Sequence, residues 1–335
     1  MSQPVLRVDG LTLRIETTAR AFDAVRNVSF HVDRGETFAI VGESGSGKSL
    51  TALSMTRLLP GNTIRPVAGS IAFDGKELSH LSEAELERLR GDRIGMVFQE
   101  PMTSLNPSMR VGQQVAEPLE LHKGMSRVNA MARVEDLFRK VRISEPARRL
   151  SEYPHRMSGG MRQRVMIALA LACDPDLVIA DEPTTALDVT TQAQILSLFK
   201  DLQRETGAAV ILITHDLAVV AENAGRVAVM YAGGIVEEAP VEPLFNDPLH
   251  PYTQGLLASI PRVGRRHGVA RRAPLPEIKG AVPPLWALPP GCTFAPRCPG
   301  ATERCRLERP TLTQVAPGRR VACFHTNAQE TAWTR

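Results

Sequence analysis

The sequence lacks any segment suited to crossing a membrane. No apolar run reaches the roughly 18 residues that a membrane-spanning helix requires. The longest candidate, residues 208–220, is interrupted by His215 and Asp216. The first residues also lack the basic and apolar regions of a secretory signal peptide. These absences predict a cytoplasmic chain that associates with a membrane only through partner proteins.

The sequence also lacks a marked excess of one charge and any internal repeat. Its 40 lysine and arginine residues are interleaved with 36 acidic residues, which leaves a net charge of +4. So small a basic excess does not indicate nucleic acid as a partner. The 335 residues exceed one typical domain, and a hydrophobic fraction of 43% supplies enough side chains for a core.

Three apolar runs lack the alternation of a half-exposed strand. They cover residues 37–41, 177–180 and 210–214. Such unbroken runs are typical of parallel strands buried on both faces. Residues 6–15 alternate instead and predict an antiparallel layer, whereas residues 110–172 are rich in helix formers. The expected fold is α/β, with a parallel-sheet core, an antiparallel β layer and a helical insert.

A glycine-rich loop follows the first apolar run. It fits the phosphate-binding pattern G-x-x-x-x-G-K-[ST] at every fixed position, as Gly42-Glu43-Ser44-Gly45-Ser46-Gly47-Lys48-Ser49. A helix over residues 50–59, ended by Pro60 and Gly61, is expected to follow. Backbone N–H groups in such a loop point at an anion, and the glycines let the chain approach it closely.

This loop predicts a site for a nucleoside triphosphate with Mg²⁺. Lys48 would reach the β- and γ-phosphates, and the Ser49 hydroxyl would coordinate Mg²⁺. The residues expected to bind the nucleotide here are Gly42, Ser44, Gly45, Ser46, Gly47, Lys48, Ser49 and Leu50.

A second motif places two acidic residues after the apolar run at 177–180. Asp181 at the end of this strand could hold Mg²⁺, and Glu182 could accept a proton from the water that attacks the phosphate. Acidic residues often follow strands, so the pair alone is a weak signal. Its position about 130 residues after the lysine loop favours a hydrolytic site.

A third motif begins a helix with Ser158, Gly159 and Gly160. Ser158 can cap this helix, and the free N–H groups at its start offer a second seat for an anion. This motif precedes the Asp181-Glu182 strand by about 20 residues. With all three motifs present, the chain resembles the ATP-binding cassette (ABC) family of P-loop NTPases. The family signature is usually Leu-Ser-Gly-Gly-Gln, and Met157 and Met161 occupy its outer positions here.

The resemblance implies four further site residues. Gln99 would touch Mg²⁺ or the attacking water and link to the helical insert, and His215 would contact the γ-phosphate. Asp188 would lie in the loop that crosses between two cassettes. An aromatic ring is expected to stack on adenine. Phe22 is the candidate for this ring, and the alternative for Phe22 is a place in the core.

The resemblance also implies a dimer of cassettes. Each ATP would lie between the lysine loop of one cassette and Ser158-Gly159-Gly160 of the other, because that helix start directs positive dipole at the γ-phosphate. ATP would hold the cassettes together, and hydrolysis would loosen them and drive attached membrane subunits. The second cassette could be a copy of this chain or a paralogue.

The end of the chain differs in composition. Residues 240–335 hold 15 of the 25 prolines and four of the five cysteines. Proline and glycine are too frequent there for long helices or strands. The segment resembles the C-terminal extension of oligopeptide and dipeptide importer ATPases through His250-Pro251-Tyr252-Thr253, Leu256-Leu257, Gly291-Cys292-Thr293-Phe294 and Arg297-Cys298. We therefore expect a nucleotide-binding domain over 1–245, with a helical subdomain at about 100–172, and an extension over 246–335.

Four cysteines in the extension suggest a metal site. Disulfides are rare in the cytosol, and the thiolates of Cys292, Cys298, Cys305 and Cys323 could hold zinc or a [4Fe–4S] cluster. Free thiols are the third possibility. The spacing lacks the C-x₂-C pairs of structural zinc, and the resemblance to the importer ATPases implies the cluster. Cys173 stands apart in sequence and is expected to be a buried, inert thiol.

The resemblance as a whole implies the ATPase subunit of an importer for di- or oligopeptides, located at the cytoplasmic face of the inner or plasma membrane. The expected partners are a second ATPase subunit, two transmembrane permease subunits and, indirectly, an extracytoplasmic peptide-binding protein. Nickel and glutathione importers share the extension, so the substrate stays open. The alternative is a soluble ABC ATPase that acts on the ribosome or DNA. Such chains usually carry two cassettes, a long coiled coil or a strongly basic arm, and this sequence has none of these.

Overall fold

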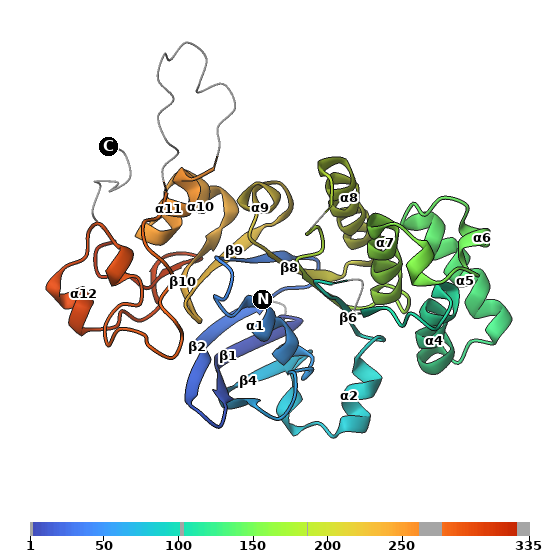
Figure 1. The fold of residues 1–335 in the computed structure, drawn as a ribbon, viewed down its shortest axis with the longest axis horizontal. Coiled ribbons are helices and arrows are strands. Elements are labelled where there is room, and N and C mark those ends of the chain that lie inside the picture. The colour runs from blue at the N-terminus through green and yellow to red at the C-terminus, as the bar shows by residue number, and fades with distance from the viewer. Residues whose placement is uncertain (1–2, 101–103, 186, 261–276, 327–335) are drawn as a thin grey trace, which may run out of the picture.

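A mixed eight-stranded sheet forms the centre of the molecule (Figure 1). The computed structural model describes residues 3–100, 104–185, 187–260 and 277–326. The strand order in this sheet is β11-β12-β10-β9-β3-β8-β7-β6. Its strands are β3 (Thr37–Val41), β6 (Ile94–Val97), β7 (Leu177–Asp181), β8 (Ala209–Thr214), β9 (Arg226–Tyr231), β10 (Gly234–Pro240), β11 (Thr313–Ala316) and β12 (Arg319–Val321).

The strands from β9 to β6 run parallel to one another, with β3 paired to β8 and β9. Both faces of β3 are covered. Phe38 and Ile40 belong to the hydrophobic core between the two sheets, whereas Ala39 and Val41 belong to a separate core on the opposite face. This burial explains why the strand lacks alternation, and the parallel core predicted from the three apolar runs is confirmed.

A second, antiparallel sheet has the order β2-β1-β4-β5. Its strands are β1 (Leu6–Glu16), β2 (Ala21–Val32), β4 (Ile64–Phe73) and β5 (Lys76–Glu77). Alternate residues of β1, such as Leu6 and Val8, are buried against the core that contains Phe38 and Ile40. The antiparallel layer predicted from residues 6–15 is therefore confirmed.

Helices build the rest of the cassette. The helical lobe at the right of Figure 1 consists of α4, α5, α6 and α7, and its core includes Val115, Phe138 and Val165. This lobe corresponds to the predicted helical insert. The helices are α1 (Lys48–Met55), α2 (Glu83–Leu89), α4 (Val111–Lys123), α5 (Arg127–Lys140), α6 (Pro146–Arg149), α7 (Gly159–Ala170), α8 (Val189–Thr206), α9 (Leu217–Asn223), α10 (Val241–Asn246), α11 (Pro251–Ala258) and α12 (Glu303–Leu307).

Helix α1 ends earlier than the sequence predicts. The expected end was at Pro60-Gly61, but the last helical residue is Met55. Arg57 adopts a left-handed conformation at φ 53°, its N–H donates to the Ser54 carbonyl, and the Leu58 N–H donates to the Leu53 carbonyl. These two bonds form the usual left-handed helix cap. The sequence did not reveal the cap because arginine replaces the glycine that normally marks it.

The C-terminal segment joins the central sheet. Strand β12 pairs with β10, and β11 pairs with β12, so the end of the chain extends the sheet edge beyond β10. Tyr252 and Phe294 share a hydrophobic core with Val41 and Tyr231. Frequent proline and glycine made this pairing invisible in the sequence, since β12 spans only Arg319–Val321.

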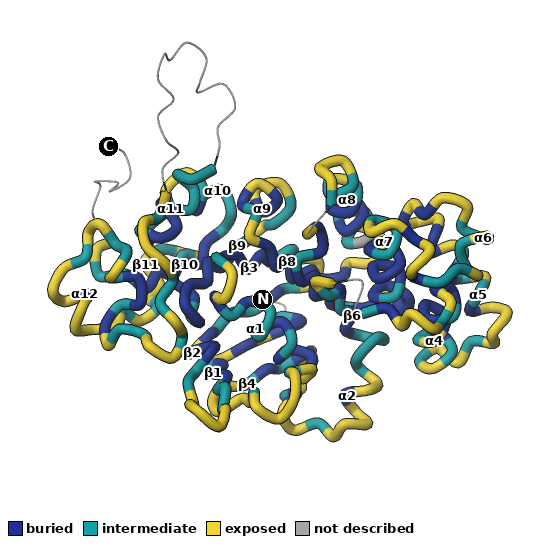
Figure 2. Tube along the Cα trace, in the orientation of Figure 1, coloured by how far each residue is buried: buried dark blue, intermediate teal, exposed yellow. Residues whose placement is uncertain are grey.

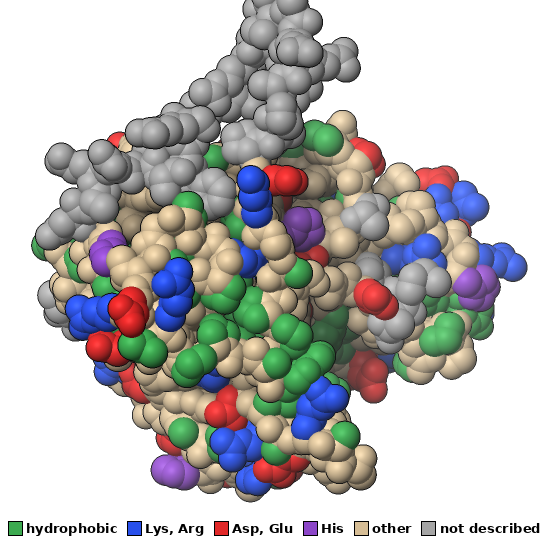
Figure 3. Space-filling model, turned by 60° about the vertical axis from the view of Figure 1, so that its left-hand side comes forward, with side chains coloured by type: hydrophobic (Ala, Val, Ile, Leu, Met, Phe, Trp, Pro, Cys, Tyr) green, Lys and Arg blue, Asp and Glu red, His purple; other side chains and the backbone are tan. Residues whose placement is uncertain are grey.

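Burial follows this layered plan. The central strands are buried, whereas exposed positions lie on the outer surfaces of the helices and in the loops (Figure 2). Acidic and basic side chains are interspersed with hydrophobic ones on the face shown in Figure 3, as expected from their near-equal numbers. Among the described residues, no helix is both long and apolar enough to cross a bilayer.

The packing of β3 yields a stability prediction. The fully buried Phe38 ring lies 5.1 Å from the Phe30 ring in a stacked arrangement. Phe38→Ala removes these contacts and leaves a cavity, so the free energy of unfolding should fall by about 3–5 kcal/mol. Denaturant titration of the full chain measures this loss. The exposed Val128 on α5 provides a control, and Val128→Ala should change stability by less than about 0.5 kcal/mol. Similar losses in both variants would contradict the assigned core.

Candidate functional site

The glycine-rich loop connects β3 to α1 in a tightly constrained path. A Cβ atom on Gly42 would lie 2.1 Å from the Met230 carbonyl oxygen, so no side chain fits there. Gly47 caps α1 with φ 101°, a conformation that glycine adopts without strain. The loop therefore directs its backbone into the space ahead of α1, where backbone N–H groups attract an anion.

Lys48 lies inside this loop. Its Nζ donates to the carbonyl oxygens of Gly42, at 2.8 Å, and Glu43, at 3.1 Å. Burial lowers the pKa of Lys48, while nearby acidic groups, with Glu182 and Asp181 foremost, act in the opposite direction. The Ser46 hydroxyl is buried and has no hydrogen-bond partner among the described residues. A buried ammonium and an unpaired hydroxyl in one loop suit a phosphate, which accepts hydrogen bonds from both.

Ser49 and Asp181 are brought together from distant parts of the chain. The Ser49 hydroxyl donates to Asp181 Oδ1 at 3.1 Å. Asp181 is only 4% exposed, and burial raises its pKa. A cation beside Asp181 would offset the cost of burying its charge, and Mg²⁺ prefers oxygen donors of this kind. The two residues therefore fit Mg²⁺.

Glu182 is held from several sides. Gln99 Nε2 donates to its Oε2 atom at 3.1 Å, and the Thr185 hydroxyl donates to the same atom at 2.8 Å. His215 Nδ1 lies 3.4 Å from the other carboxylate oxygen. The Glu182 backbone is left-handed at φ 46°, and its N–H donates to the Ile213 carbonyl. Such a strained backbone persists only where its surroundings fix it, as at many functional sites.

Lys48, Ser49, Gln99 and Glu182 line one cavity of about 240 Å³, whereas Ser46, Asp181 and His215 are not among its lining residues. The cavity residues are Ile15, Ala24, Ser44, Gly45, Gly47, Lys48, Ser49, Leu50, Gln99, Glu182 and Leu285. Most of them were predicted from motifs. Ile15, Ala24 and Leu285 were not, because single aliphatic residues give no signal in a sequence.

Phe22 lies outside this set of cavity residues. Its ring meets Trp286 edge-on, with centroids 5.9 Å apart, and the Arg20 guanidinium lies 4.7 Å from the centre of the Trp286 ring. Trp286 comes from the C-terminal segment, so only the fold could place it next to Phe22. The sequence prediction of adenine stacking by Phe22 stays a prediction.

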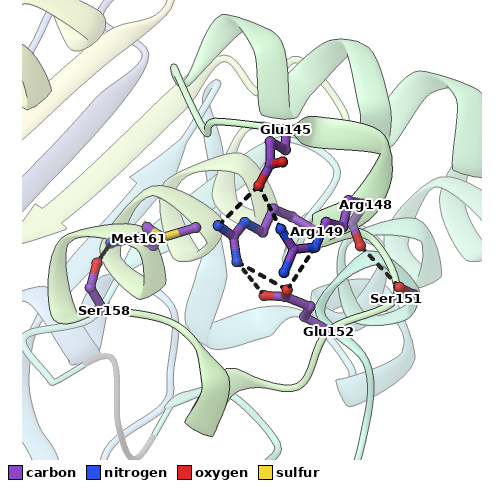
Figure 4. Close-up of polar contacts among 7 residues, drawn as sticks. All are labelled: Glu145, Arg148, Arg149, Ser151, Glu152, Ser158 and Met161. Atoms are coloured by element: carbon purple, nitrogen blue, oxygen red, sulfur yellow. Dashed lines mark hydrogen bonds and ion pairs between the residues drawn. The ribbon is translucent and has the colours of Figure 1, made fainter.

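The Ser158 motif lies at the start of α7, in the helical lobe. Ser158 caps the helix by accepting a hydrogen bond from the Met161 N–H at 3.3 Å (Figure 4). Ser158 and Gly159 are exposed, and a Cβ on Gly159 would meet open space. Within the described residues, this motif does not line the cavity around Lys48. The structure thus leaves an exposed helix start that is separate from the cavity at its own phosphate loop.

Ion pairs stabilise the chain segment that leads to this helix. Arg149 donates to both carboxylate oxygens of Glu152, at 2.9 and 3.0 Å, and also reaches Glu145 (Figure 4). The Glu152 carbonyl accepts the N–H of Val111, which connects the segment to the first residue of α4. The Arg149 and Glu152 side chains are less than one-fifth exposed. One arginine nitrogen, Nη1, donates to both carboxylate oxygens. Charge-assisted hydrogen bonds of this kind are stronger than neutral ones, so the pair stabilises the segment that leads to Ser158.

Asp188 serves locally as the N-cap of α8. It accepts hydrogen bonds from the N–H and the hydroxyl of Thr191, at 2.9 and 2.7 Å. These hydrogen bonds hold the pKa of Asp188 below its usual value. Its predicted role between two cassettes concerns a partner chain and stays a prediction.

Two residues from the C-terminal segment contact the phosphate loop directly. The Glu43 N–H donates to the Tyr252 hydroxyl at 3.0 Å. Arg297 forms a two-pronged ion pair with the Glu43 carboxylate, at 2.8 and 3.1 Å. Sequence reasoning missed both contacts because more than 200 residues separate the partners.

The predicted iron–sulfur cluster is wrong, and so is its zinc alternative. Across the described ranges, no group of three or more histidine, cysteine, aspartate or glutamate residues could hold a metal ion. Cys305 instead lies 3.3 Å from the Thr302 hydroxyl and 3.5 Å from His325 Nε2. Burial raises the pKa of Cys292, Cys298 and Cys323, to about 11 for Cys298. Burial thus favours protonated thiols, whereas a metal requires thiolates.

Cys173 follows α7 and is buried in the core of the helical lobe. Burial raises its pKa to about 11. The thiol is therefore protonated near neutral pH and has the environment of an unreactive packing residue.

A lysine loop, an Asp-Glu strand end and an exposed Ser-Gly-Gly helix start on one α/β sheet define a P-loop nucleotide hydrolase of the cassette type. Two family descriptions match the chain: "ABC transporter" at residues 25–185 and "Oligopeptide/dipeptide transporter, C-terminal region" at residues 236–305.

The chain is 55% identical over 304 residues to the probable peptide ABC transporter ATP-binding protein y4tR of Sinorhizobium fredii, covering 91% of this chain and 90% of that protein. It is 49% identical to the oligopeptide transport ATP-binding protein AppD of Bacillus subtilis, with 96% of each chain covered. A solved dimer of the cassette MJ0796 with ADP and phosphate has a TM-score of 0.65 and 31% identity, covering 70% of this chain and 98% of that one. The chain belongs to the ABC transporter family, and it is an ATPase of that family.

The buried His250, which caps helix α11, makes stability depend on pH. Burial lowers its pKa from 6.5 to about 3, and its Nδ1 accepts the Tyr252 N–H. The folded chain thus binds fewer protons here than the unfolded chain, so stability should fall as the pH drops from 6.5 towards 3. The loss approaches about 1.4 kcal/mol per pH unit. His250→Asn keeps an acceptor for Tyr252 but cannot titrate, so its unfolding free energy should depend less on pH. Denaturant titrations at several pH values between 6.5 and 4.5 measure the unfolding free energy. If it falls equally steeply with pH in the wild type and in His250→Asn, the prediction is wrong.

Proposed function

We propose that this chain is the ATP-hydrolysing subunit of an ABC importer for di- or oligopeptides. One observation supports the hydrolytic part most strongly. Lys48, Ser49 and Glu182 line one cavity, and Ser49 donates a hydrogen bond to Asp181, although the loop and the acidic pair lie far apart in sequence. The peptide substrate class rests on the C-terminal region match and on relatives named for peptide or oligopeptide transport.

The phosphate loop binds the triphosphate before any chemistry occurs. Lys48 and the backbone N–H groups of the loop hold the β- and γ-phosphates, and the Ser46 hydroxyl donates to a phosphate oxygen. Because Lys48 is 5% exposed, water competes weakly for its ammonium, and the attraction for phosphate is strong. Leu50, Ile15 and Leu285 supply apolar walls to the same cavity.

Glu182 acts as the general base in this proposal. Its carboxylate takes the proton of the attacking water while the bond from the γ-phosphorus to the β–γ bridging oxygen breaks, which yields ADP and phosphate. Gln99 and Thr185 hold one carboxylate oxygen in place, and His215 lies beside the other. His215 contacts the γ-phosphate of bound ATP, and this contact is lost once the phosphate has been released.

Ser49 and Asp181 are the residues that would hold Mg²⁺, and Gln99 offers a further amide oxygen. The ion would neutralise charge on the phosphates during the transfer. Mg²⁺ bound with a nucleotide takes most of its ligands from phosphate and water, so few protein ligands are needed.

The signature helix serves a second cassette. Ser158, Gly159 and Gly160 are open to an incoming ligand at the N-terminus of α7, and the MJ0796 cassette was solved as a dimer. We propose that two cassettes enclose ATP between the phosphate loop of one and Ser158 of the other. Asp188 lies at this dimer junction. The partner is a second copy or a paralogue.

The remaining assignments are proposals about the assembly. The cassette occupies residues 1–245, with its helical subdomain at about 100–172, and residues 246–335 form the extension. Two permease subunits recruit the chain to the cytoplasmic face of the membrane, and an extracytoplasmic binding protein delivers the peptide to them. The ribosome- or DNA-associated alternative is not supported, since the relatives described above are named as transport proteins.

Replacing the general base tests the hydrolytic mechanism. Glu182→Gln removes proton acceptance but keeps the shape and the hydrogen bonds of the side chain. Phosphate release in the assembled transporter should fall by about 10²–10⁴-fold, while ATP binding persists and a closed dimer accumulates. The exposed Glu87 on α2 supplies a control, and Glu87→Gln should hydrolyse ATP normally. Hydrolysis near the wild-type rate in Glu182→Gln would remove Glu182 from this role.

A bulky cation at the signature tests the contribution to the partner. Ser158→Arg should block hydrolysis in the assembled dimer, because the arginine fills the seat of the partner's γ-phosphate. ATP affinity of the isolated chain, measured by equilibrium dialysis, should stay unchanged. Ser126→Arg at the N-cap of α5 is the matched control and should leave both measurements unaffected. A loss of ATP affinity in isolated Ser158→Arg would instead place the serine in its own nucleotide site.

A further inference from the structure

The structure assigns the C-terminal extension a part in the nucleotide site: Arg297 is a positioning residue that holds the phosphate loop through Glu43. The inference rests on the proposed role of Lys48 in ATP binding. It extends that role by naming what fixes Lys48 from outside the cassette.

Glu43 is held by the extension at both its backbone and its side chain. Its N–H donates to the Tyr252 hydroxyl at 3.0 Å, and its carboxylate takes two hydrogen bonds from Arg297. The Glu43 carbonyl in turn accepts a hydrogen bond from Lys48 Nζ at 3.1 Å. A continuous chain of contacts therefore runs from Arg297 through Glu43 to the phosphate-binding ammonium.

Arg297 is built into the extension as a rigid support. Its side chain is 6% exposed, against 29% for Glu43. Its other hydrogen bonds go to the carbonyl oxygens of Ile278 and Lys279, both at 3.2 Å, and to the Tyr231 hydroxyl at 3.5 Å. An arginine fork matches a carboxylate in a fixed plane. A nearly buried fork with this many partners leaves Glu43 little freedom.

An aromatic cluster of Tyr231, Tyr252 and Phe294 holds the ring of Tyr252, whose hydroxyl contacts the Glu43 N–H. The Tyr252 ring lies 4.6 Å from the ring of Tyr231 and 5.4 Å from the ring of Phe294, measured between centroids. Phe294 is the N-cap of a short helical turn, Ala295–Arg297, and Arg297 is its last residue, so the same segment supplies both the packing and the ion pair. Leu285 of the extension also lines the nucleotide cavity. Tyr252 and Arg297 thus contact the loop at Glu43, and Leu285 lines the cavity that the loop borders.

The consequence is that docking of the extension sets ATP affinity. When Glu43 is held, its carbonyl and that of Gly42 keep Lys48 oriented, and binding pays little ordering entropy. When Arg297 is lost, Glu43 carries a half-buried charge without its partner, and the loop can leave the binding conformation. The catalytic step changes little, because the hydrogen bonds and the ion pair that hold Glu182 come from Gln99, Thr185 and His215 and not from the extension.

The test measures ATP affinity of the full-length chain and the kinetics of the assembled transporter. Arg297→Met keeps the apolar stem but removes the fork, so the Kd and the KM for ATP should rise about tenfold. The kcat should stay within about twofold. Arg297→Lys restores the charge without the fork and should recover part of the affinity. Tyr252→Phe keeps the ring and loses only the acceptor for the Glu43 N–H, and it should shift Kd in the same direction.

The matched control is Arg309, which donates to the carbonyl oxygens of Gly291 and Pro289 within the extension. Arg309→Met loosens the extension without removing a contact to Glu43, so ATP affinity should stay near the wild-type value. In the double variant Glu43→Gln with Arg297→Met, the loss should not exceed the larger single loss, because both changes act on one pair.

Two results would overturn the inference. Equal losses of affinity in Arg297→Met and Arg309→Met would show a general structural effect. Unchanged Kd in both Arg297→Met and Tyr252→Phe would separate the extension from ATP binding. Lys48→Ala distinguishes this failure from failure of the proposed function: if Lys48→Ala binds ATP normally, the phosphate-binding assignment itself is wrong.

Discussion

The site depends on how closely the phosphate loop is pressed against its neighbours. Gly42 passes so near the Met230 carbonyl of β9 that no Cβ fits between them. The loop is therefore fixed to the strand beside β3, and Lys48 follows because its ammonium binds carbonyl oxygens of the same loop. Every other element of the site is arranged around this fixed ammonium. The parallel sheet supplies that arrangement, since β3, β7 and β8 end side by side.

The site also requires that the buried charges of Lys48 and Asp181 balance each other. Burial lowers the pKa of Lys48 and raises the pKa of Asp181, and each group offsets the cost of burying the other. Glu182 lies next to them in a strained backbone conformation, held by Gln99 and Thr185. Such preorganised groups lose little free energy to rearrangement during the reaction. A nucleotide with its cation completes the same charge balance.

The cassette and the C-terminal extension form one physical unit around this loop. Strand β12 extends the central sheet, and Tyr252 and Arg297 form hydrogen bonds with Glu43. The helical lobe instead presents Ser158 outward, at a helix start anchored by the Arg149–Glu152 pair. The cysteines of the extension do not form a metal site within the described residues. The extension is organised by aromatic packing, sheet pairing and ion pairs such as the one between Arg297 and Glu43.

The sequence by itself determined the parallel core, the antiparallel layer and the motif residues Lys48, Asp181 and Glu182, because each depends on local patterns of spacing and polarity. It placed the end of α1 too late, since Arg57 adopts a conformation that only a glycine would have signalled. It also suggested a metal centre from cysteine counts, which ignore where the side chains lie. Only the tertiary structure decided that Leu285 lines the cavity and that Arg297 holds Glu43. Those contacts join residues more than 200 positions apart, and the packing that brings them together leaves no periodic trace in the chain.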